Sequence, residues 1–288
     1  MSTTNPPDWH DIDVTGPLEG TLYEKHDDGV AVITLNRPER GNSFHAGMGP
    51  VLRAIWEDVR TDPAVRAVVI TGAGDRHFCT GVDVKGVSEG GGAVAHNRPF
   101  GEEVFWSARH NQVWKPVVAA VNGTAAGGGL HFVVDADIVV ASENARFIDT
   151  HTNIGMVGGI ENIGLAKRMP IGTALRMSLQ GPDFKLGAAR AHQLGLVDEL
   201  VGPGEALDAA LEIARSIARN SPSATTLTQQ AIWGSLDMTY EASLRHAWSL
   251  IRLQWGHPDF LEGPRAFAEG RAPEWDPDLD ARNAGPGA

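Results

Sequence analysis

Cysteine is almost absent from this chain of 288 residues, because only Cys79 is present. A single cysteine excludes an internal disulfide and any metal site built mainly from thiolates. A protein without disulfides suits a reducing compartment, so we expect a cytoplasmic location. The first residues also lack the basic and apolar segments of a secretion signal, which agrees with that expectation.

Positive charge and long apolar runs are scarce as well. The chain has 24 Lys and Arg against 36 Asp and Glu, a formal net charge of −12, and no basic tract. Nucleic-acid binding depends on clustered Lys and Arg, so we expect no nucleic-acid partner. No apolar run reaches the roughly 18 residues that a membrane helix needs, so we expect no membrane role. The 42% of hydrophobic and 21% of charged residues are ordinary for a folded globular protein.

Strand and helix patterns alternate through the first half of the chain. Short β-branched runs predict strands, and apolar residues spaced three or four apart predict helices. Such alternation favours right-handed ββα or βαβ units and therefore an α/β core. We expect strands at 21–25, 29–35, 65–74, 115–123, 136–142 and 145–149, and helices at 46–63, at 100–114 and from Gly128 onward.

From about Gly204 the character of the sequence changes. The segments that follow have helical periodicity with no strand pattern between them. We therefore expect a helical C-terminal subdomain. The expected organisation is a flexible arm over residues 1–20, a core with the active site over 21–203, the helical subdomain over 204–275 and a flexible tail over 276–288.

Two strand-end loops are rich in glycine, HFCTGVDVK at 77–85 and NGTAAGGGLHF at 122–132. In open α/β sheets ligands bind outside the carboxyl ends of the strands, so the two loops can close on one site. Glycine lets backbone N–H groups approach a ligand closely, and two such donors can stabilise an oxyanion. Glycine-rich turns are also common packing devices, so the glycines alone leave both interpretations open.

Five segments resemble the crotonase (enoyl-CoA hydratase/isomerase) superfamily in order and spacing. The resemblance runs from about Thr21 to Arg271 and implies a crotonase-like spiral of ββα units with a C-terminal helical oligomerisation subdomain. It also implies an acyl-CoA substrate, no permanently bound cofactor apart from the coenzyme A of the substrate, and a homotrimer or dimer of trimers. The matching segments are 29–44, 65–85, 115–129, 135–147 and 172–201.

The resemblance also assigns binding residues. It places the thioester oxygen between the backbone N–H groups of Val82 and Gly128. Near the C-terminus the family usually has a Lys-Arg pair that reaches a neighbouring subunit's CoA. This chain has Gly270-Arg271 there, which puts that contact in doubt. The residues expected along CoA, with the cationic ones near its phosphates, are Arg37, Arg40, Val82, Asp83 and Lys85.

The chain departs from the family at the two catalytic glutamates of the hydratases, whose positions hold His131 and His151. Imidazole can transfer protons in their place. A histidine in the first turn of a helix feels the positive helix end, which favours the neutral base at neutral pH. The same histidines could instead form a polar wall, or mark a member that has lost catalysis. A zinc site lacks a third ligand at metal spacing, so we expect no metal.

Two carboxylates lie near these histidines in the sequence, Asp149 and Glu161. Some family members that hydrolyse or displace groups use an acid on the later loop, close to Glu161. A histidine–carboxylate pair would activate a water molecule, because the acid orients the base. The sequence leaves two pairs open, His151 with Glu161 and His131 with Asp149, and Asp149 could instead be only a turn residue.

Three functions therefore compete. The first is an acyl-CoA enzyme of the hydratase/isomerase group, which stabilises a thioester enolate and uses His131, His151 and Glu161 for proton transfer. The second is retro-Claisen hydrolysis of a carbon–carbon bond in a β-diketone or β-keto thioester. The third is a CoA-binding protein without turnover. The sequence does not define the acyl group.

Overall fold

The structure is a computed structural model in which residues 8–83 and 99–282 are described. Its main sheet has six strands in the order β1-β2-β3-β5-β7-β10. The first pair is antiparallel and the remaining neighbours are parallel. The strands are β1 (Thr21–Lys25), β2 (Val30–Leu35), β3 (Ala67–Gly72), β5 (Val117–Val121), β7 (Ile138–Ser142) and β10 (Glu199–Val201).

A second, smaller sheet has the order β4-β6-β8-β9, in which only the last pair is antiparallel. Its strands are β4 (His77–Cys79), β6 (Thr124–Ala126), β8 (Arg146–Ile148) and β9 (Leu186–Gly187). Each long strand from β3 onward is followed along the chain by a short strand of this second sheet, as in β3–β4, β5–β6 and β7–β8. The successive units stack in parallel, which builds the expected spiral of ββα units.

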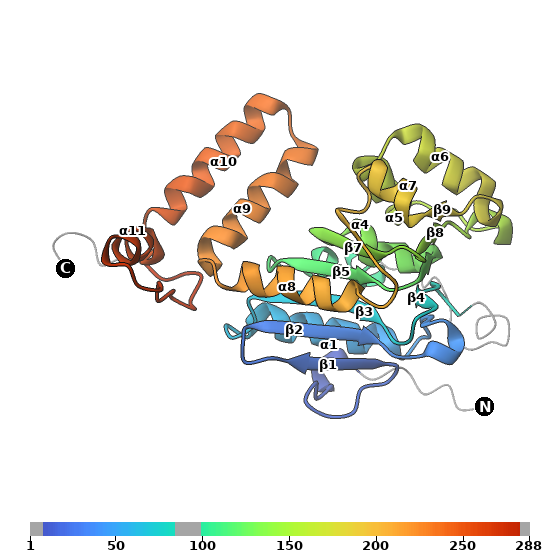
Figure 1. Cartoon of the computed structure of the whole chain (residues 1–288), viewed down its shortest axis with the longest axis horizontal. Coiled ribbons are helices and arrows are strands. Elements are labelled where there is room, and N and C mark those ends of the chain that lie inside the picture. Colours follow the sequence, from blue (N-terminus) through green and yellow to red (C-terminus); the bar gives the residue numbers. More distant parts are fainter. Residues whose placement is uncertain (1–7, 84–98, 283–288) are drawn as a thin grey trace.

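The helices fill the connections between units and then form the C-terminal region (Figure 1). The α-helices are α1 (Met48–Thr61), α3 (Phe100–Glu103), α4 (His131–Val134), α5 (Ile160–Arg168), α6 (Ile171–Gln180), α7 (Ala188–Gln193), α8 (Ala206–Ala218), α9 (Pro222–Gly234), α10 (Tyr240–Gln254) and α11 (Asp259–Glu269). Short 3-10 helices are η1 (Trp9–Asp11), η2 (Pro38–Arg40), η3 (Arg109–Asn111), η4 (Gly127–Leu130), η5 (Thr152–Ile154), η6 (Gly181–Asp183) and η7 (Ser235–Asp237).

The helix predicted over 100–114 is wrong. Helix α3 stops at Glu103, and only the turn η3 follows before β5. Tertiary packing explains the break, because Trp106 stacks on Phe44 at 4.6 Å between ring centroids and its carbonyl accepts a hydrogen bond from the Trp56 indole. Aromatic residues have only modest helix propensity, so these contacts outweigh a helical backbone.

Helix α8 belongs to the core by its packing. Four alanines spaced four apart, Ala206, Ala210, Ala214 and Ala218, are buried against the valines of the main sheet, including Val32, Val69, Val118 and Val140. Residues four apart lie on one face of a helix, and small side chains allow the helix to approach the sheet closely. Helix α8 is the first helix of the C-terminal helical region, yet it packs on the core sheet. The predicted boundary between core and helical subdomain near Gly204 therefore remains a prediction.

Helices α9 to α11 extend away from the two sheets (Figure 1). Helix α9 is tied to the core by its Trp233 indole, which donates a 2.6 Å hydrogen bond to Asp137. Helix α10 buries none of its residues within this chain. Large apolar side chains are exposed on this region, among them Ile232, Tyr240, Leu244, Trp248, Ile251 and Phe267.

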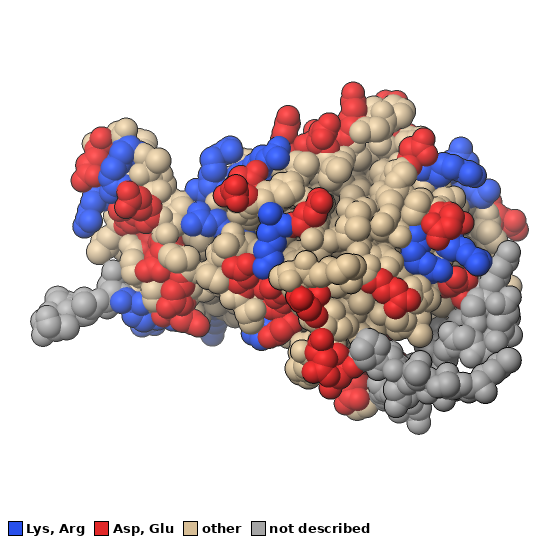
Figure 2. Space-filling model, turned by 90° about the horizontal axis from the view of Figure 1, so that it is seen from below, with Lys and Arg blue, Asp and Glu red and all other residues tan. Residues whose placement is uncertain are grey.

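In the described part of the chain, none of the helices has the length and apolar character to cross a membrane. On the face seen in Figure 2, acidic and basic side chains are interspersed, and the basic ones form no continuous field.

Candidate active site

The loop after β4 touches the 3-10 helix η4 through two glycines. Gly81 has a φ of +84°, and a Cβ added to it would lie 2.7 Å from the backbone nitrogen of Gly128. Only glycine fits both the dihedral angle and the contact. The backbone that leads from Gly81 into Val82 therefore starts directly beside Gly128.

The N–H group of Val82 points away from Phe44, the residue that it pairs with. Val82 forms an isolated parallel bridge with Phe44, in which Phe44 donates to the Gly81 carbonyl at 2.7 Å and Asp83 donates to the Phe44 carbonyl at 2.8 Å. In this pattern the flanking residues make the hydrogen bonds, so Val82 directs its own N–H to the other side. Gly128 lies at the start of η4, where N–H groups have no acceptor within the helix. The backbone segments that carry the two predicted donors thus lie side by side.

Gly127 links this pair of donors to His151. It has a φ of +50°, and a Cβ at this position would lie 2.8 Å from the Thr150 hydroxyl oxygen and 4.0 Å from Cε1 of His151. On the other side, η4 runs directly into α4, whose first residue is His131. Both predicted histidines therefore border the glycine turn.

Glu161 contacts both histidines. It lies in the first turn of α5, and its side chain is almost fully buried. Its Oε1 is 2.9 Å from Nε2 of His151, and its Oε2 is 3.6 Å from Nε2 of His131. The sequence placed one carboxylate on this later loop, and the structure brings it between the two imidazoles.

Asp149 holds the opposite side of the His151 ring. Its Oδ1 is 2.7 Å from Nδ1 of His151 and accepts a second hydrogen bond, at 2.9 Å, from the backbone N–H of the same residue. Its Oδ2 accepts from the Asn162 amide, which also contacts the Ser178 hydroxyl. Of the two pairs that the sequence left open, the structure forms His151 with Glu161, and Asp149 joins His151 rather than His131.

These contacts fix opposite protonation states for the two histidines. Hydrogen bonds to Asp149 and Glu161 raise the pKa of His151 to about 10. Burial lowers the pKa of His131, and the nearby charge of Glu161 opposes this only in part. Burial alone would raise the pKa values of Glu161 and Asp149, but their hydrogen bonds, led by those from His151, together with nearby positive charge lower both. At neutral pH, His131 is a neutral imidazole beside a fixed imidazolium–carboxylate group.

A second group of polar residues lies against His131. The His110 ring packs edge-on to it with 5.5 Å between centroids, and the Ser107 hydroxyl donates to Asp135 at 2.6 Å and contacts Nδ1 of His110 at 2.9 Å. His110, His131 and Asp135 offer potential ligand atoms within 4.8 Å of one another, and these are ligand types that transition metals accept. Sequence reasoning missed this group, because His110 comes from a distant segment that was expected to be a continuous helix.

The residues predicted to line CoA are only partly brought together. Arg37 donates to the Ser43 carbonyl at 2.7 Å and lies 3.2 Å from the Asp83 carboxylate, so two of the predicted residues contact each other. Arg40 is exposed on η2. Lys85 lies outside the described residues. Their contact with CoA remains a prediction.

Arg271, which follows the end of α11, is hydrogen-bonded to acidic side chains of its own chain. Its guanidinium makes two hydrogen bonds to Glu262, at 2.5 and 3.0 Å, and one to Glu269 at 2.7 Å. The preceding Gly270 ends the helix with a φ of +68°. Arg271 would have to leave both acids in order to reach a neighbouring subunit.

Comparison with known proteins defines the class. The family model for enoyl-CoA hydratase/isomerase matches residues 25–278. (E)-benzylidenesuccinyl-CoA hydratase from Thauera aromatica is 36% identical over 249 residues, covering 85% of this chain and 94% of the relative. Carnitinyl-CoA dehydratase from Proteus mirabilis is 34% identical over 259 residues, with the same shares covered.

The solved structures agree with these relatives. An enoyl-CoA hydratase/isomerase from Mycobacterium paratuberculosis superposes with a TM-score of 0.81 at 35% identity, covering 91% of this chain and all of the other. The fold is therefore the α/β crotonase fold with two mixed sheets and C-terminal helices. The chain belongs to the enoyl-CoA hydratase/isomerase (crotonase) family, and its relatives are hydratases and dehydratases of CoA thioesters.

Proposed function

We propose that this enzyme hydrates an enoyl-CoA thioester, or dehydrates the corresponding hydroxyacyl-CoA, with His131 as the proton-transfer group. The observation that carries the proposal is the contact of Glu161 with both His131 and His151 beside the glycine turn. That contact supplies one buried carboxylate to a site in which we expect histidines at the places of both hydratase glutamates. The names of the two relatives, a hydratase and a dehydratase, support the same reaction class.

In the proposed reaction the N–H groups of Val82 and Gly128 bind the thioester oxygen. Neutral His131 removes a proton from water as the water oxygen attacks the β-carbon, and the electron pair of the double bond moves onto the thioester oxygen. The two N–H donors stabilise the resulting enolate. The His131 imidazolium then returns a proton to the α-carbon, which regenerates the neutral base.

His151 has a different role in this scheme. With a pKa of about 10 it stays protonated through the neutral range and is a poor base. Its hydrogen bonds to Asp149 and Glu161 hold the Glu161 carboxylate in place. That carboxylate orients the His131 ring and stabilises its protonated form, as the acid does in a nucleophile–base–acid triad.

The same groups could support a second function, retro-Claisen cleavage of a β-diketone or β-keto thioester. The observation that favours it is the buried histidine–carboxylate group, because this reaction needs an activated water beside a carbonyl. Water would attack one carbonyl carbon, the carbon–carbon bond would break, and the N–H donors would bear the charge of the departing enolate. His131 would take the proton from water and return it to the carbon.

Absorbance of the enoyl thioester distinguishes these functions. We expect purified protein to consume crotonyl-CoA or a larger enoyl-CoA, and His131→Ala to reduce the rate by roughly 100- to 10,000-fold. His10→Gln, which changes an exposed histidine, is the matched control and should leave the rate unchanged. Opening of a cyclic β-diketone without CoA would favour the second function. CoA binding with no turnover of a broad acyl panel would contradict both and leave a binding protein.

We also propose that α9 to α11 mediate association into trimers or dimers of trimers. Support comes from the apolar side chains that this region exposes, among them Tyr240, Leu244 and Trp248. Scattered apolar residues are ordinary on a surface, but a set on neighbouring helices indicates an interface. Light scattering should give a multiple of three chains, and a monomer at micromolar concentration would exclude this proposal.

A further inference from the structure

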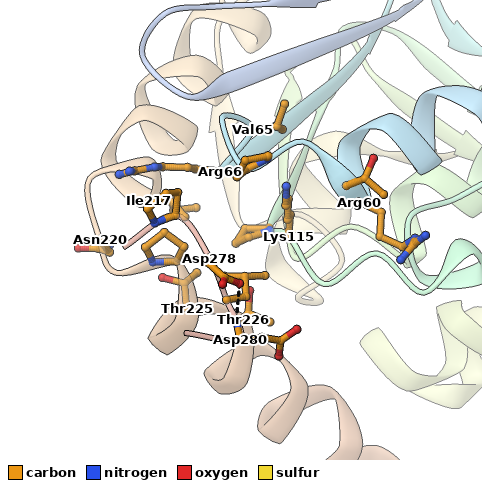
Figure 3. A pocket seen from close by; sticks show the side chains of 16 residues that line it. Arg60, Val65, Arg66, Lys115, Ile217, Asn220, Thr225, Thr226, Asp278 and Asp280 are labelled. Carbon is orange, nitrogen blue, oxygen red and sulfur yellow. Dashed lines mark hydrogen bonds between the residues drawn. The ribbon is translucent and has the colours of Figure 1, made fainter. Parts of the chain in front are cut away.

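A cavity of about 400 Å³ lies at the amino ends of β3 and β5, whereas the candidate active-site loops follow β4 and β6 (Figure 3). This volume falls within the range of small-molecule sites. Its polar lining includes Arg60, Arg66 and Lys115, together with two acids on the C-terminal segment, Asp278 and Asp280. Its apolar walls include Val65, Pro116, Ile217, Pro222 and Leu279.

Lys115 is a buried cation without a carboxylate partner in the described part of the chain. The residue is 8% exposed, and its Nζ donates a 2.6 Å hydrogen bond to the Asp62 carbonyl, just after the last turn of α1. The carboxylates of Asp62 and Asp58 are instead held by Lys25, at 2.7 and 2.6 Å. Burying a charge without a counter-charge is costly, so the neutral form of Lys115 is favoured.

The amine is also chemically prepared to react. Burial lowers the pKa of Lys115 to about 8. Near pH 8 about half of the amine is therefore neutral, whereas an ordinary lysine with a pKa near 10.4 is neutral in less than about 1% of molecules. A neutral lysine amine is a nucleophile.

We propose that Lys115 is an acylation site, at which Nζ accepts a short acyl group from an acyl-CoA thioester and the acyl chain occupies this cavity. The neutral nitrogen attacks the thioester carbonyl and a C–N bond forms. The C–S bond then breaks, and its electron pair leaves on the sulfur of CoA. The nitrogen loses one proton to solvent, and the CoA thiolate takes one up, so the products are an amide and free CoA.

The residues around Lys115 also fit the acylated lysine that the reaction would form. An Nε-acyl lysine keeps one N–H, so it can retain the hydrogen bond to the Asp62 carbonyl while losing the buried charge. The apolar walls accept a short hydrocarbon chain. Arg66, whose guanidinium donates only to the Ala218 carbonyl among the described residues, adds positive charge at the cavity for the CoA phosphates during the encounter. The reaction needs no residue of the candidate active site, so it does not rest on the proposed hydration.

Site-resolved mass spectrometry tests this proposal. The chain has only four other lysines, Lys25, Lys85, Lys167 and Lys185, and Lys115 precedes a proline, so trypsin yields the same peptide with or without acylation. After incubation of the full chain with acetyl-CoA or butyryl-CoA at pH 8, we expect Lys115 to be acylated about 10-fold or more faster than the exposed Lys185. The ratio follows from the difference in neutral amine, reduced for the lower nucleophilicity of a weaker base.

Two variants test whether acylation of Lys115 is independent of the candidate active site and depends on the cavity. His131→Ala should leave Lys115 acylation unchanged, whereas Leu279→Trp, which narrows the cavity, should slow it several-fold without changing Lys185. The rate at Lys115 should level off above about pH 9, because its amine is then almost fully neutral. Equal rates at Lys115 and Lys185, or no adduct at Lys115, would overturn the proposal.

Discussion

Glu161 and His151 form the central contact of the candidate site, with 2.9 Å between Oε1 and Nε2. Because Asp149 binds the other ring nitrogen at 2.7 Å, the imidazolium is fixed on both sides. The second oxygen of Glu161 is left facing His131. One carboxylate thus connects a ring that is charged at neutral pH to a ring that is neutral.

The first prediction concerns this connection. Glu161→Gln removes the charge that raises the pKa of His131, so the acid limb of the pH–rate profile should move to lower pH. The maximal rate should fall about 10- to 100-fold, because the His131 cation loses its stabilising partner. A fall in rate with an unmoved pH profile would argue that Glu161 does not act through His131.

Gly81 provides a test of the backbone donors. Gly81→Ala places a Cβ 2.7 Å from the Gly128 nitrogen in a residue with a φ of +84°, so the two donors must move apart. Loss of one oxyanion donor typically costs about 100- to 1,000-fold in rate, and we expect a loss of that order. Gly172→Ala is the matched control, because a Cβ there meets no atom within 4 Å and its activity should be unchanged. Full activity of the Gly81 variant would contradict the oxyanion assignment.

The raised pKa of His151 predicts a pH-dependent stability. A group whose pKa is higher in the folded state stabilises the protein fully below its unfolded value, here about 6.5, and loses that effect as the pH rises through about 10. Each displaced pKa unit corresponds to about 1.4 kcal/mol. The difference in the free energy of unfolding between the wild type and His151→Gln should therefore be largest near pH 6 and shrink toward pH 10.

Chemical denaturation at several pH values measures this difference. The carboxylate partners have lowered pKa values, so their contribution persists near pH 6 and is lost only in more acidic solution. His10→Gln, at an exposed position, is the matched control for the loss of a histidine side chain. A constant difference between pH 6 and pH 10 would show that His151 is not held as an imidazolium.

Helix α8 predicts a packing effect. Ala214 is fully buried against the main sheet, so Ala214→Leu should force the helix away and lower the free energy of unfolding by about 1–3 kcal/mol. Ser216→Leu adds a side chain of similar size at an exposed position of the same helix and should change stability little. Equal effects of the two changes, measured by denaturant unfolding, would refute the close helix–sheet contact.

Much of this fold could be predicted from local patterns. The strands β2, β3, β5 and β7 are continuous β-branched or apolar runs, β1 and β8 are predicted by shorter or more polar runs, and the C-terminal helices have clear helical periodicity. The short strands β4 and β6 have no such signal, because their three residues are fixed by the neighbouring strand rather than by their own pattern. The helix predicted around Trp106 was wrong for a related reason. The conformation of this segment depends on an aromatic contact with Phe44, which lies far away in the sequence.

The residues of the candidate site that belong to a sequence motif could be predicted. The pairings that depend on contacts between distant segments could not. The glycine turns predicted Val82 and Gly128 as donors, and the family positions predicted His131 and His151 as proton-transfer groups. The structure places these residues around one glycine turn, and their roles remain predictions. The sequence could not show which carboxylate pairs with which histidine. Asp149 turns toward His151 because Asn162, which comes from the distant helix α5, holds its other carboxylate oxygen. No spacing rule connects His110 with His131, which approach each other from separate ββα units.

The contact between Gly81 and Gly128 has one more consequence. It joins main-chain atoms of consecutive ββα units, so in the proposed mechanism the path of the polypeptide, and not any side chain, determines where negative charge is stabilised. On that proposal, the side chains at positions 131 and 151 can be exchanged while the backbone donors stay in place, which would let an enzyme of this kind gain a new reaction.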